Sequence, residues 1–190
     1  MNHPYRLGVV LLILLTVTAG CASVKVSQDY DVTTDFSRLQ TYAWHPGAPE
    51  KSGGAPTDNP LLTSRIRAAV EKNLSQMGYR KIETGSPDFY VTTTYSVRRK
   101  IDSGGVRTGV GIGIGGSGTF GSVGVSGSPV REIEEGTLVI DVSDANEGGL
   151  LWRGTGTYEV KPEKDPQKTT EKINRVVEKI MAQFPPQPQG

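Results

Sequence analysis

Cysteine, histidine and an excess of either charge are nearly absent from this chain. Of its 190 residues, one is Cys and two are His, which excludes an internal disulfide framework and a multi-Cys metal site. The 21 basic and 20 acidic side chains leave a net charge of +1. This balance lacks both the basic footprint of a nucleic-acid-binding protein and the charge excess of a disordered chain. The length suits one ordinary domain.

The apolar run near the N-terminus is too short to cross a bilayer. It covers residues 7–17, which is 11 residues, whereas a spanning helix needs roughly 20. Arg6 precedes the run and small residues follow it up to Gly20, which is the pattern of an export signal. We therefore expect residues 1–20 to be a cleaved signal peptide. Its removal leaves a neutral mature chain, which can attract charged partners only through local patches of charge.

The position of the single Cys indicates lipid attachment. Thr18-Ala19-Gly20 before Cys21 resembles the bacterial lipobox, whose Cys is diacylated on sulfur, cleaved at its amino side after Gly20 and acylated again on nitrogen. Thr18 departs from the Leu that is usual there, and a plain cleaved signal or a short membrane anchor is the alternative. Several acyl chains, at about 0.8 kcal/mol per buried CH₂, would give lasting attachment. Ala22 in place of Asp favours the outer membrane under the sorting rule of enterobacterial lipoproteins.

Hydrophobic periodicity predicts two helices, each opened by a capping residue and a proline. Asn59-Pro60 begins the first, and Gly78 is its expected stop. Asp165-Pro166 begins the second, which Pro185-Pro186 ends. Each helix carries one apolar stripe, formed by Leu62, Ile66, Ala69, Val70, Leu74 and Met77 in the first and by Ile173, Val176, Val177, Ile180 and Phe184 in the second.

Alternating and β-branched segments predict five strands around these helices. The element order predicts one α+β domain over residues 21–186, an antiparallel sheet with both helices packed on one face. Residues 144–149 are rich in turn formers and predict a hairpin, whereas 187–190 form a tail that does not fold. Further expected features are strands at 24–28, 41–44, 89–97, 137–142 and 150–160, a helical turn at 35–38 and an exposed loop at 45–58.

A glycine-rich insertion interrupts this pattern at residues 103–128, which hold 11 of the 24 Gly. Its alternation at 110–114 favours a weakly ordered hairpin that returns through Val123 and Val125, with a mobile loop as the alternative. Such a hairpin could accept another strand or a partner surface. The three-glycine pattern at 113–118 lacks the following helix that dinucleotide binding requires, so no nucleotide is expected.

The remaining polar constellations fit structural roles better than chemical ones. Residues 144–148 are similar to the start of a calcium loop, but Thr155 stands where the bidentate Glu must be. His45 is the only His after signal cleavage and gives neither a metal site nor a catalytic triad. The three Asp within residues 29–35 suit turn and cap positions. We predict no cofactor and no metal.

Two tryptophans are expected in the core rather than on a binding platform. These are Trp44 and Trp152. Gly154 and Gly156 share a strand face with Trp152 and Tyr158, and we expect them to leave room for large rings across that strand.

Seven segments, spread over nearly the whole mature chain, resemble one bacterial family. The segments are Asp29–Asp31, Asp35–Trp44, Asn59–Arg67, Pro87–Tyr90, Gly136–Asp141, Leu151–Gly154 and Phe184–Pro186. They resemble the lipoprotein family called domain of unknown function 4136, and the likeness runs from about Val24 to Pro186. The resemblance implies a small envelope lipoprotein domain with no established reaction and no catalytic residues to carry over. Residues 103–128 are the least family-like part.

These observations favour a non-enzymatic function. The expected protein is a periplasmic domain held to the outer membrane by acyl chains on Cys21, supporting or contacting an envelope protein partner. The alternative is a binding module for a small envelope ligand, a glycan fragment or a lipid, which a deep apolar pocket between the helices and the sheet would favour. A hydrolase is the least favoured class, and neither nucleic acid nor nucleotide is an expected partner.

Overall fold

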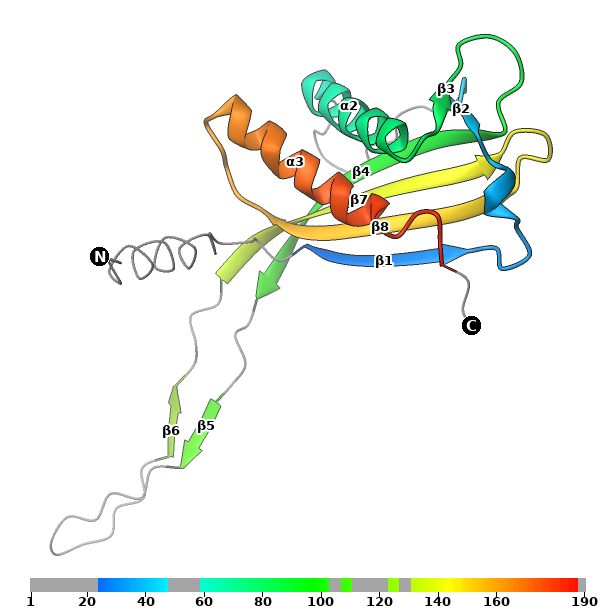
Figure 1. Cartoon of the computed structure of the whole chain (residues 1–190). Coiled ribbons are helices and arrows are strands. Elements are labelled where there is room, and N and C mark those ends of the chain that lie inside the picture. The colour runs from blue at the N-terminus through cyan, green and yellow to red at the C-terminus, as the bar shows by residue number, and fades with distance from the viewer. Residues whose placement is uncertain (1–23, 48–58, 103–106, 111–122, 127–130, 188–190) are drawn as a thin grey trace, which may run out of the picture.

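The computed structural model describes residues 24–47, 59–102, 107–110, 123–126 and 131–187 of the chain. Within these residues, a long twisted sheet carries two helices on one of its faces (Figure 1). In chain order the elements are β1 Lys25–Tyr30, the 3₁₀ turn η1 Phe36–Arg38, β2 Thr41–Trp44, α2 Pro60–Gln76, β3 Arg80–Lys81, β4 Phe89–Asp102, β5 Arg107–Val110, β6 Val123–Ser126, β7 Arg131–Asp144, β8 Leu150–Val160 and α3 Pro166–Met181.

The main sheet has six strands in the order β1-β8-β7-β4-β2-β3. The pairs β1/β8, β7/β8 and β4/β7 are antiparallel, and β7 and β8 form the predicted hairpin. The expected purely antiparallel sheet is wrong at the other edge, because β2 pairs in parallel with both β3 and β4. The cause is α2, which crosses over one face of the sheet and returns the chain in the direction of β2, as a parallel pair requires. The sheet is therefore mixed, within the predicted α+β class.

The central hairpin strands continue beyond their predicted ends. β4 and β7 stay paired from Phe89 opposite Asp144 to Asp102 opposite Arg131. Beyond this ladder, β5 and β6 pair antiparallel as a separate two-stranded sheet. This pairing agrees with the hairpin form of the glycine-rich insertion, while residues 111–122 lie outside the described residues.

Both helices begin where the sequence predicts. The Asn59 side chain accepts hydrogen bonds from the Leu61 and Leu62 amides at 3.0 and 3.3 Å, and the Asp165 carboxylate accepts one from the Gln167 amide at 2.8 Å. These bonds satisfy amides of the first turn that have no partner within the helix. The prolines that follow the caps occupy the first helical positions.

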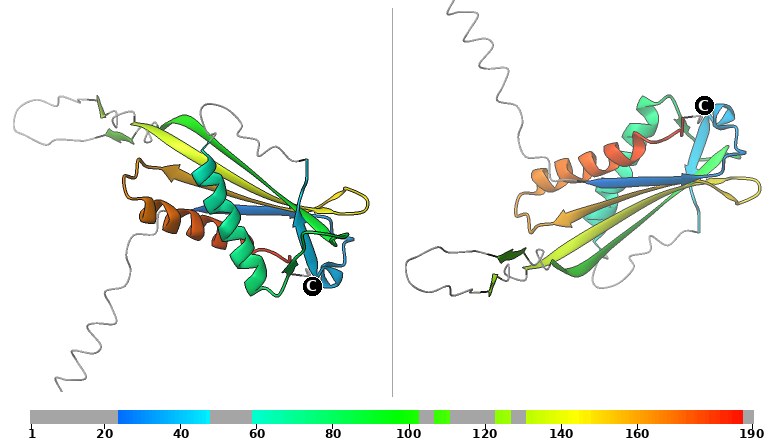
Figure 2. Two further views of the ribbon diagram at one scale, coloured as in Figure 1. Left: turned by 90° about the horizontal axis from the view of Figure 1, so that it is seen from above. Right: turned by 90° about the horizontal axis from the view of Figure 1, so that it is seen from below.

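The core fills the layer between the helices and the sheet, and both helices lie on the same side of the strands (Figure 2). Alternate residues of β4, β7 and β8 point into this layer, as expected for strands with one covered face. The most completely buried large side chains are Trp152, Tyr42, Phe89, Leu74, Leu138, Ile140 and Ile180. Trp44 packs against the core only in part, and Met77, expected in the apolar stripe of α2, is 38% exposed. Met77 lies outside the stripe because α2 ends at Gln76 and leaves it as the C-cap.

α3 approaches β8 closely over two glycines. A Cβ atom on Gly154 would lie 2.5 Å from Cγ2 of Ile180 and 2.7 Å from Cζ2 of Trp152, and one on Gly156 would lie 2.7 Å from Cδ1 of Ile180. Real Cβ atoms do not reach such distances. The prediction that these glycines make room for a large ring is confirmed at Gly154, which faces Trp152, whereas at Gly156 aliphatic side chains of Ile180 and Val176 occupy the space instead of a ring.

We expect Ile180→Ala to destabilise the fold strongly. Ile180 is fully buried, and truncating such a side chain costs about 2–5 kcal/mol through lost burial and a residual cavity. For a domain of this size the melting temperature should fall by about 4–20 °C. Thermal unfolding followed by circular dichroism measures it, with Glu178→Ala on the exposed face of α3 as the control. Equal melting curves for Ile180→Ala and the wild type would contradict this packing.

Candidate functional site

A hollow of about 540 Å³ lies at the C-terminal end of β1. Its walls come from three stretches, residues 30–40 after β1, residues 77–79 at the end of α2 and residues 185–187 after α3. We call it the end groove. Three of the segments that carry the family resemblance, 29–31, 35–44 and 184–186, thus meet at one place in the fold.

Aromatic rings support the end groove from below. Phe184 is buried, and its ring centre lies 6.0 Å from that of Phe36 and 5.5 Å from that of Tyr79, two residues that line the groove. Tyr30, another lining residue, meets Phe36 edge-on at 6.3 Å. Such offset and edge-on contacts are favourable for aromatic pairs. The groove therefore has an apolar floor fixed to the core.

Two large apolar side chains stand at the surface of the end groove. Val32 is 82% exposed and Met77 is 38% exposed, and both line the hollow. The prediction from sequence did not identify them. Their signals were an apolar residue inside a run of turn formers and a Met directly before the glycine that ends α2.

Asp31 and Asp35, the two carboxylates that line the groove, each stabilise the turn in which they lie, as predicted. The Thr33 hydroxyl donates to Asp31 at 2.7 Å and the Ser37 hydroxyl donates to Asp35 at 2.6 Å. These hydroxyl bonds, followed by bonds from the same residues' amides, hold the pKa of each carboxyl below its usual range. Both carboxyls are thus ionised at neutral pH, which leaves them without the proton that a general acid needs. Arg38 pairs with Asp35 at 2.9 Å, so the negative charge of the groove rim comes mainly from Asp31.

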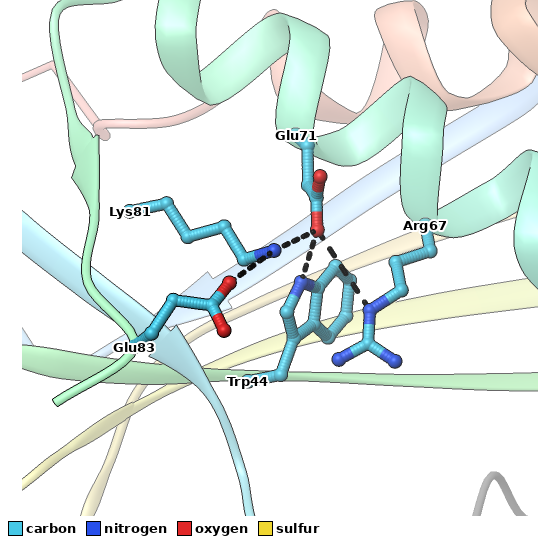
Figure 3. Close-up of polar contacts among 5 residues, drawn as sticks. All are labelled: Trp44, Arg67, Glu71, Lys81 and Glu83. Atoms are coloured by element: carbon cyan, nitrogen blue, oxygen red, sulfur yellow. Dashed lines mark hydrogen bonds and ion pairs between the residues drawn. The ribbon is translucent and has the colours of Figure 1, made fainter.

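A polar cluster ties α2 to the parallel edge of the sheet (Figure 3). Oε1 of Glu71 accepts a hydrogen bond from the Trp44 indole at 2.7 Å and lies 3.1 Å from the Lys81 ammonium. The Arg67 guanidinium lies 4.4 Å from the centre of the Trp44 ring, a cation–π arrangement. Glu83 pairs with Lys81 at 3.2 Å. One carboxylate oxygen thus joins β2, β3 and α2, which is a structural role.

Asp88 fixes the start of the same edge, and the prediction from sequence missed it. Its Oδ2 atom accepts hydrogen bonds from the Gln40 amide at 3.0 Å, the Thr41 amide at 2.7 Å and the Thr41 hydroxyl at 2.8 Å. The Thr41 hydroxyl bond, with the two amide bonds, lowers the pKa of the Asp88 carboxyl. The carboxylate therefore holds the first residue of β2 beside β4.

The sheet face opposite the helices carries a bidentate ion pair. Nε and one terminal nitrogen of Arg153 each lie 2.7 Å from a carboxylate oxygen of Asp141. Asp29 stands opposite Arg153 on β1, so three residues of family-like segments form one row across β1, β8 and β7. The Asp141 carboxylate raises the pKa of Arg153.

The other residues singled out in the sequence have structural roles or lie outside the described residues. Asp144 accepts hydrogen bonds from the Asn146 and Glu147 amides at 2.7 Å, so residues 144–149 form a hairpin turn. The ring of His45 meets that of Tyr90 edge-on at 5.2 Å. Cys21, Gly20 and the glycine pattern at 113–118 lie outside the described residues.

Within the described residues there is neither a metal-ligand cluster nor a membrane-spanning helix. No group of three or more His, Cys, Asp and Glu within them is arranged to hold a metal ion. In the part of the chain that the structure covers, no helix has the length and hydropathy to cross a membrane.

The chain belongs to the family "Domain of unknown function (DUF4136)", whose model matches residues 26–186. The expected family is thereby confirmed. No curated protein matches the chain.

A solved structure shares the fold at low sequence identity. A PDZ domain protein from Parabacteroides distasonis is 16% identical with a TM-score of 0.53, and the match covers 88% of this chain and 36% of that one. The chain thus spans about a third of that protein's length. A PelC dodecamer from Paraburkholderia phytofirmans is 10% identical with a TM-score of 0.45, covering 84% of this chain and 96% of that one.

We expect Asp88→Ala to loosen the β2 edge in a pH-dependent way. The substitution removes the acceptor of two amides and one hydroxyl, which should cost about 1–2 kcal/mol after solvent screening of a partly exposed group. Because the folded-state pKa is lowered, the stabilisation is full above the unfolded pKa and is lost as pH falls through the folded value.

Urea denaturation between pH 7 and pH 3 measures this effect. The difference in unfolding free energy between wild type and Asp88→Ala should be largest at neutral pH and should shrink below about pH 4. Glu147→Ala, at an exposed turn position, is the control and should change little. A difference that grows on acidification would contradict the assignment.

Proposed function

We propose that this member of the DUF4136 family is a lipid-anchored domain of the outer membrane that binds an envelope protein partner and catalyses no reaction. The observation that carries the proposal is the end groove, an apolar hollow with exposed Val32 and Met77 and with walls from three family-like segments. An exposed apolar hollow rimmed by polar groups is typical of a binding site. The attachment through acyl chains rests on Cys21 in its lipobox-like setting.

A short tether would hold the domain against the membrane. Val24, three residues after Cys21, already packs against the core. An extended chain advances at most about 3.6 Å per residue, so the acylated Cys would lie within about 11 Å of Val24. The end groove lies at the other end of β1, about 20 Å farther along a strand of this length. The groove therefore lies at the end of β1 that is farther from the anchor, where a partner can reach it.

The chemistry of the end groove favours one kind of partner. Its floor is aromatic, its exposed side chains are apolar, and its rim carries the ionised Asp31 and Asp35. A protein segment that presents apolar and basic side chains complements these features. A small ligand buried between the helices and the sheet is less favoured, because core side chains such as Trp152 and Ile180 fill that layer.

We expect Cys21→Ser to abolish lipid attachment. The serine hydroxyl cannot replace the thiol that acylation requires, and Cys21 is the only Cys in the chain. Metabolic labelling with an alkyne fatty acid, followed by membrane fractionation, measures it. The nearby Ser23→Ala should keep full labelling, and undiminished labelling of Cys21→Ser would contradict the anchor.

We expect a photo-crosslinking residue at Val32 to capture one envelope protein in intact cells. The matched control places the same residue at Leu61, which is 66% exposed on α2 and outside the end groove. A third variant adds Met77→Lys to the Val32 probe, since a positive charge in the groove should repel a basic partner and reduce the crosslink at least about fivefold.

The three probes separate the candidate functions. A product at position 32 that is absent at position 61 and weakened by Met77→Lys supports a protein partner. A small adduct at position 32, identified by mass spectrometry, would replace it with the small-ligand function. The same products at both positions, or no effect of Met77→Lys, would contradict the groove as the binding surface.

A further inference from the structure

Four basic residues lie along one side of α3. Lys168, Lys172, Arg175 and Lys179 are separated by four, three and four residues, which places them on one helical face. The apolar face of α3 is turned to the core. The basic row therefore follows the flank of α3 beside β1, the strand that α3 contacts at the sheet edge.

This row lines a second hollow, of about 340 Å³, which we call the basic pocket. Besides the four residues on α3, the pocket is lined by Lys161, the acidic residues Glu163 and Glu171, and an apolar group of Val24, Tyr158 and Val176. Five basic and two acidic side chains thus surround an apolar floor. In a chain of net charge +1, this is a local patch of positive charge.

Within the described residues, the positive charges of the basic pocket outnumber the nearby carboxylates. Among these five basic residues, only Lys161 has a carboxylate within 4 Å there, Glu159 at 3.6 Å. Nζ of Lys172 donates to the Glu159 carbonyl at 2.9 Å and lies 5.3 Å from the centre of the Tyr158 ring. Burial, and next the charge of Lys161, lowers the pKa of the Lys172 ammonium. A bound anion would relieve this crowding of like charges.

The basic pocket lies where the chain would leave the membrane. Val24 is part of its lining, and Cys21 precedes Val24 by three residues. If Cys21 is acylated, as proposed above, headgroups of the bilayer lie within about 11 Å of the pocket along the tether. The end groove, at the opposite end of β1, has the opposite rim charge.

We propose that the basic pocket binds the phosphate of an anionic phospholipid headgroup in the membrane that carries the anchor. Lys and Arg donors bind phosphate through charge-assisted hydrogen bonds, and basic clusters beside a membrane attachment are attracted to anionic lipid. The apolar floor of Val24, Tyr158 and Val176 suits the hydrocarbon part of a lipid, which free phosphate lacks. This inference rests on the proposed function. It gives the basic pocket the role of orienting the domain on the bilayer.

The test uses the whole mature chain, residues 21–190, made without acyl chains, so the result does not depend on whether Cys21 is lipidated. Its binding is measured by co-sedimentation with vesicles of phosphatidylcholine alone and of equal parts phosphatidylcholine and phosphatidylglycerol. We expect binding to the anionic vesicles only, weakened by high salt through screening.

Two double variants locate the binding surface. Arg175→Gln with Lys179→Gln should reduce affinity for anionic vesicles about 25-fold, since each basic residue near an anionic surface contributes about fivefold. Arg65→Gln with Lys72→Gln removes the same charge from α2 and should leave affinity nearly unchanged. All four are partly or fully exposed positions, and thermal melting verifies that the variants fold.

Each outcome decides the proposal. Selective loss in the α3 variant supports it, even if the fatty-acid labelling of Cys21 fails. Equal loss in both variants, or equal binding to the two vesicle types, would overturn it. A last outcome would overturn the assignment of a lipid ligand and identify free phosphate instead. In that case inorganic phosphate displaces the vesicles at equal charge concentration and shifts the NMR signals of the pocket lysines.

Discussion

The close approach of α3 to β8 is the constraint on which the rest of the structure depends. Because Gly154 and Gly156 have no side chain, Ile180 and the ring of Trp152 can lie directly on the strand. With α3 held there, the chain that follows it brings Phe184 within 5.1 to 6.1 Å of four aromatic rings, those of Trp152, Tyr79, Phe36 and Phe89. The same seating of α3 fixes one wall of the end groove and turns the basic row toward the edge of the sheet.

A different chemistry holds the other edge, where apolar burial is less complete. β2 is short and its pairing with β4 is parallel, an arrangement slightly weaker per residue than the antiparallel one. Two carboxylates fix the position of this edge. Asp88 accepts three hydrogen bonds from Gln40 and Thr41, and Glu71 contacts both Trp44 and Lys81. A wrong register at this edge would leave these charged acceptors without their donors, which is costly for partly buried groups.

The sequence predicted the local features well and the distant pairings poorly. Helix starts at Asn59 and Asp165 and the bounds of β8 agree with the structure, because caps, prolines and alternation act within a few residues of each other. The parallel pairing of β2 could not be predicted in this way, since its partners lie more than 35 residues away and α2 sets its direction. The end groove was missed for the same reason: Val32, Met77 and Pro186 come from three distant parts of the chain, and none carries a signal of function alone. The role of Asp88 was missed because its three donors lie 47 or 48 residues away in the sequence.

The length and direction of β1 connect the two hollows into one functional arrangement. Val24, directly before β1, lines the basic pocket, and Tyr30 at the end of β1 lines the end groove. The strand therefore separates a positively charged end from an apolar end with a negative rim. An anionic membrane surface would attract the first end and repel the rim of the second, and the proposed acylation of Cys21 would place the first end close to the bilayer. If Cys21 is acylated as proposed, charge would therefore favour an orientation in which the end groove lies on the side away from the bilayer. Although the net charge of the chain is only +1, its charges could act in this way because they are separated along β1 and α3.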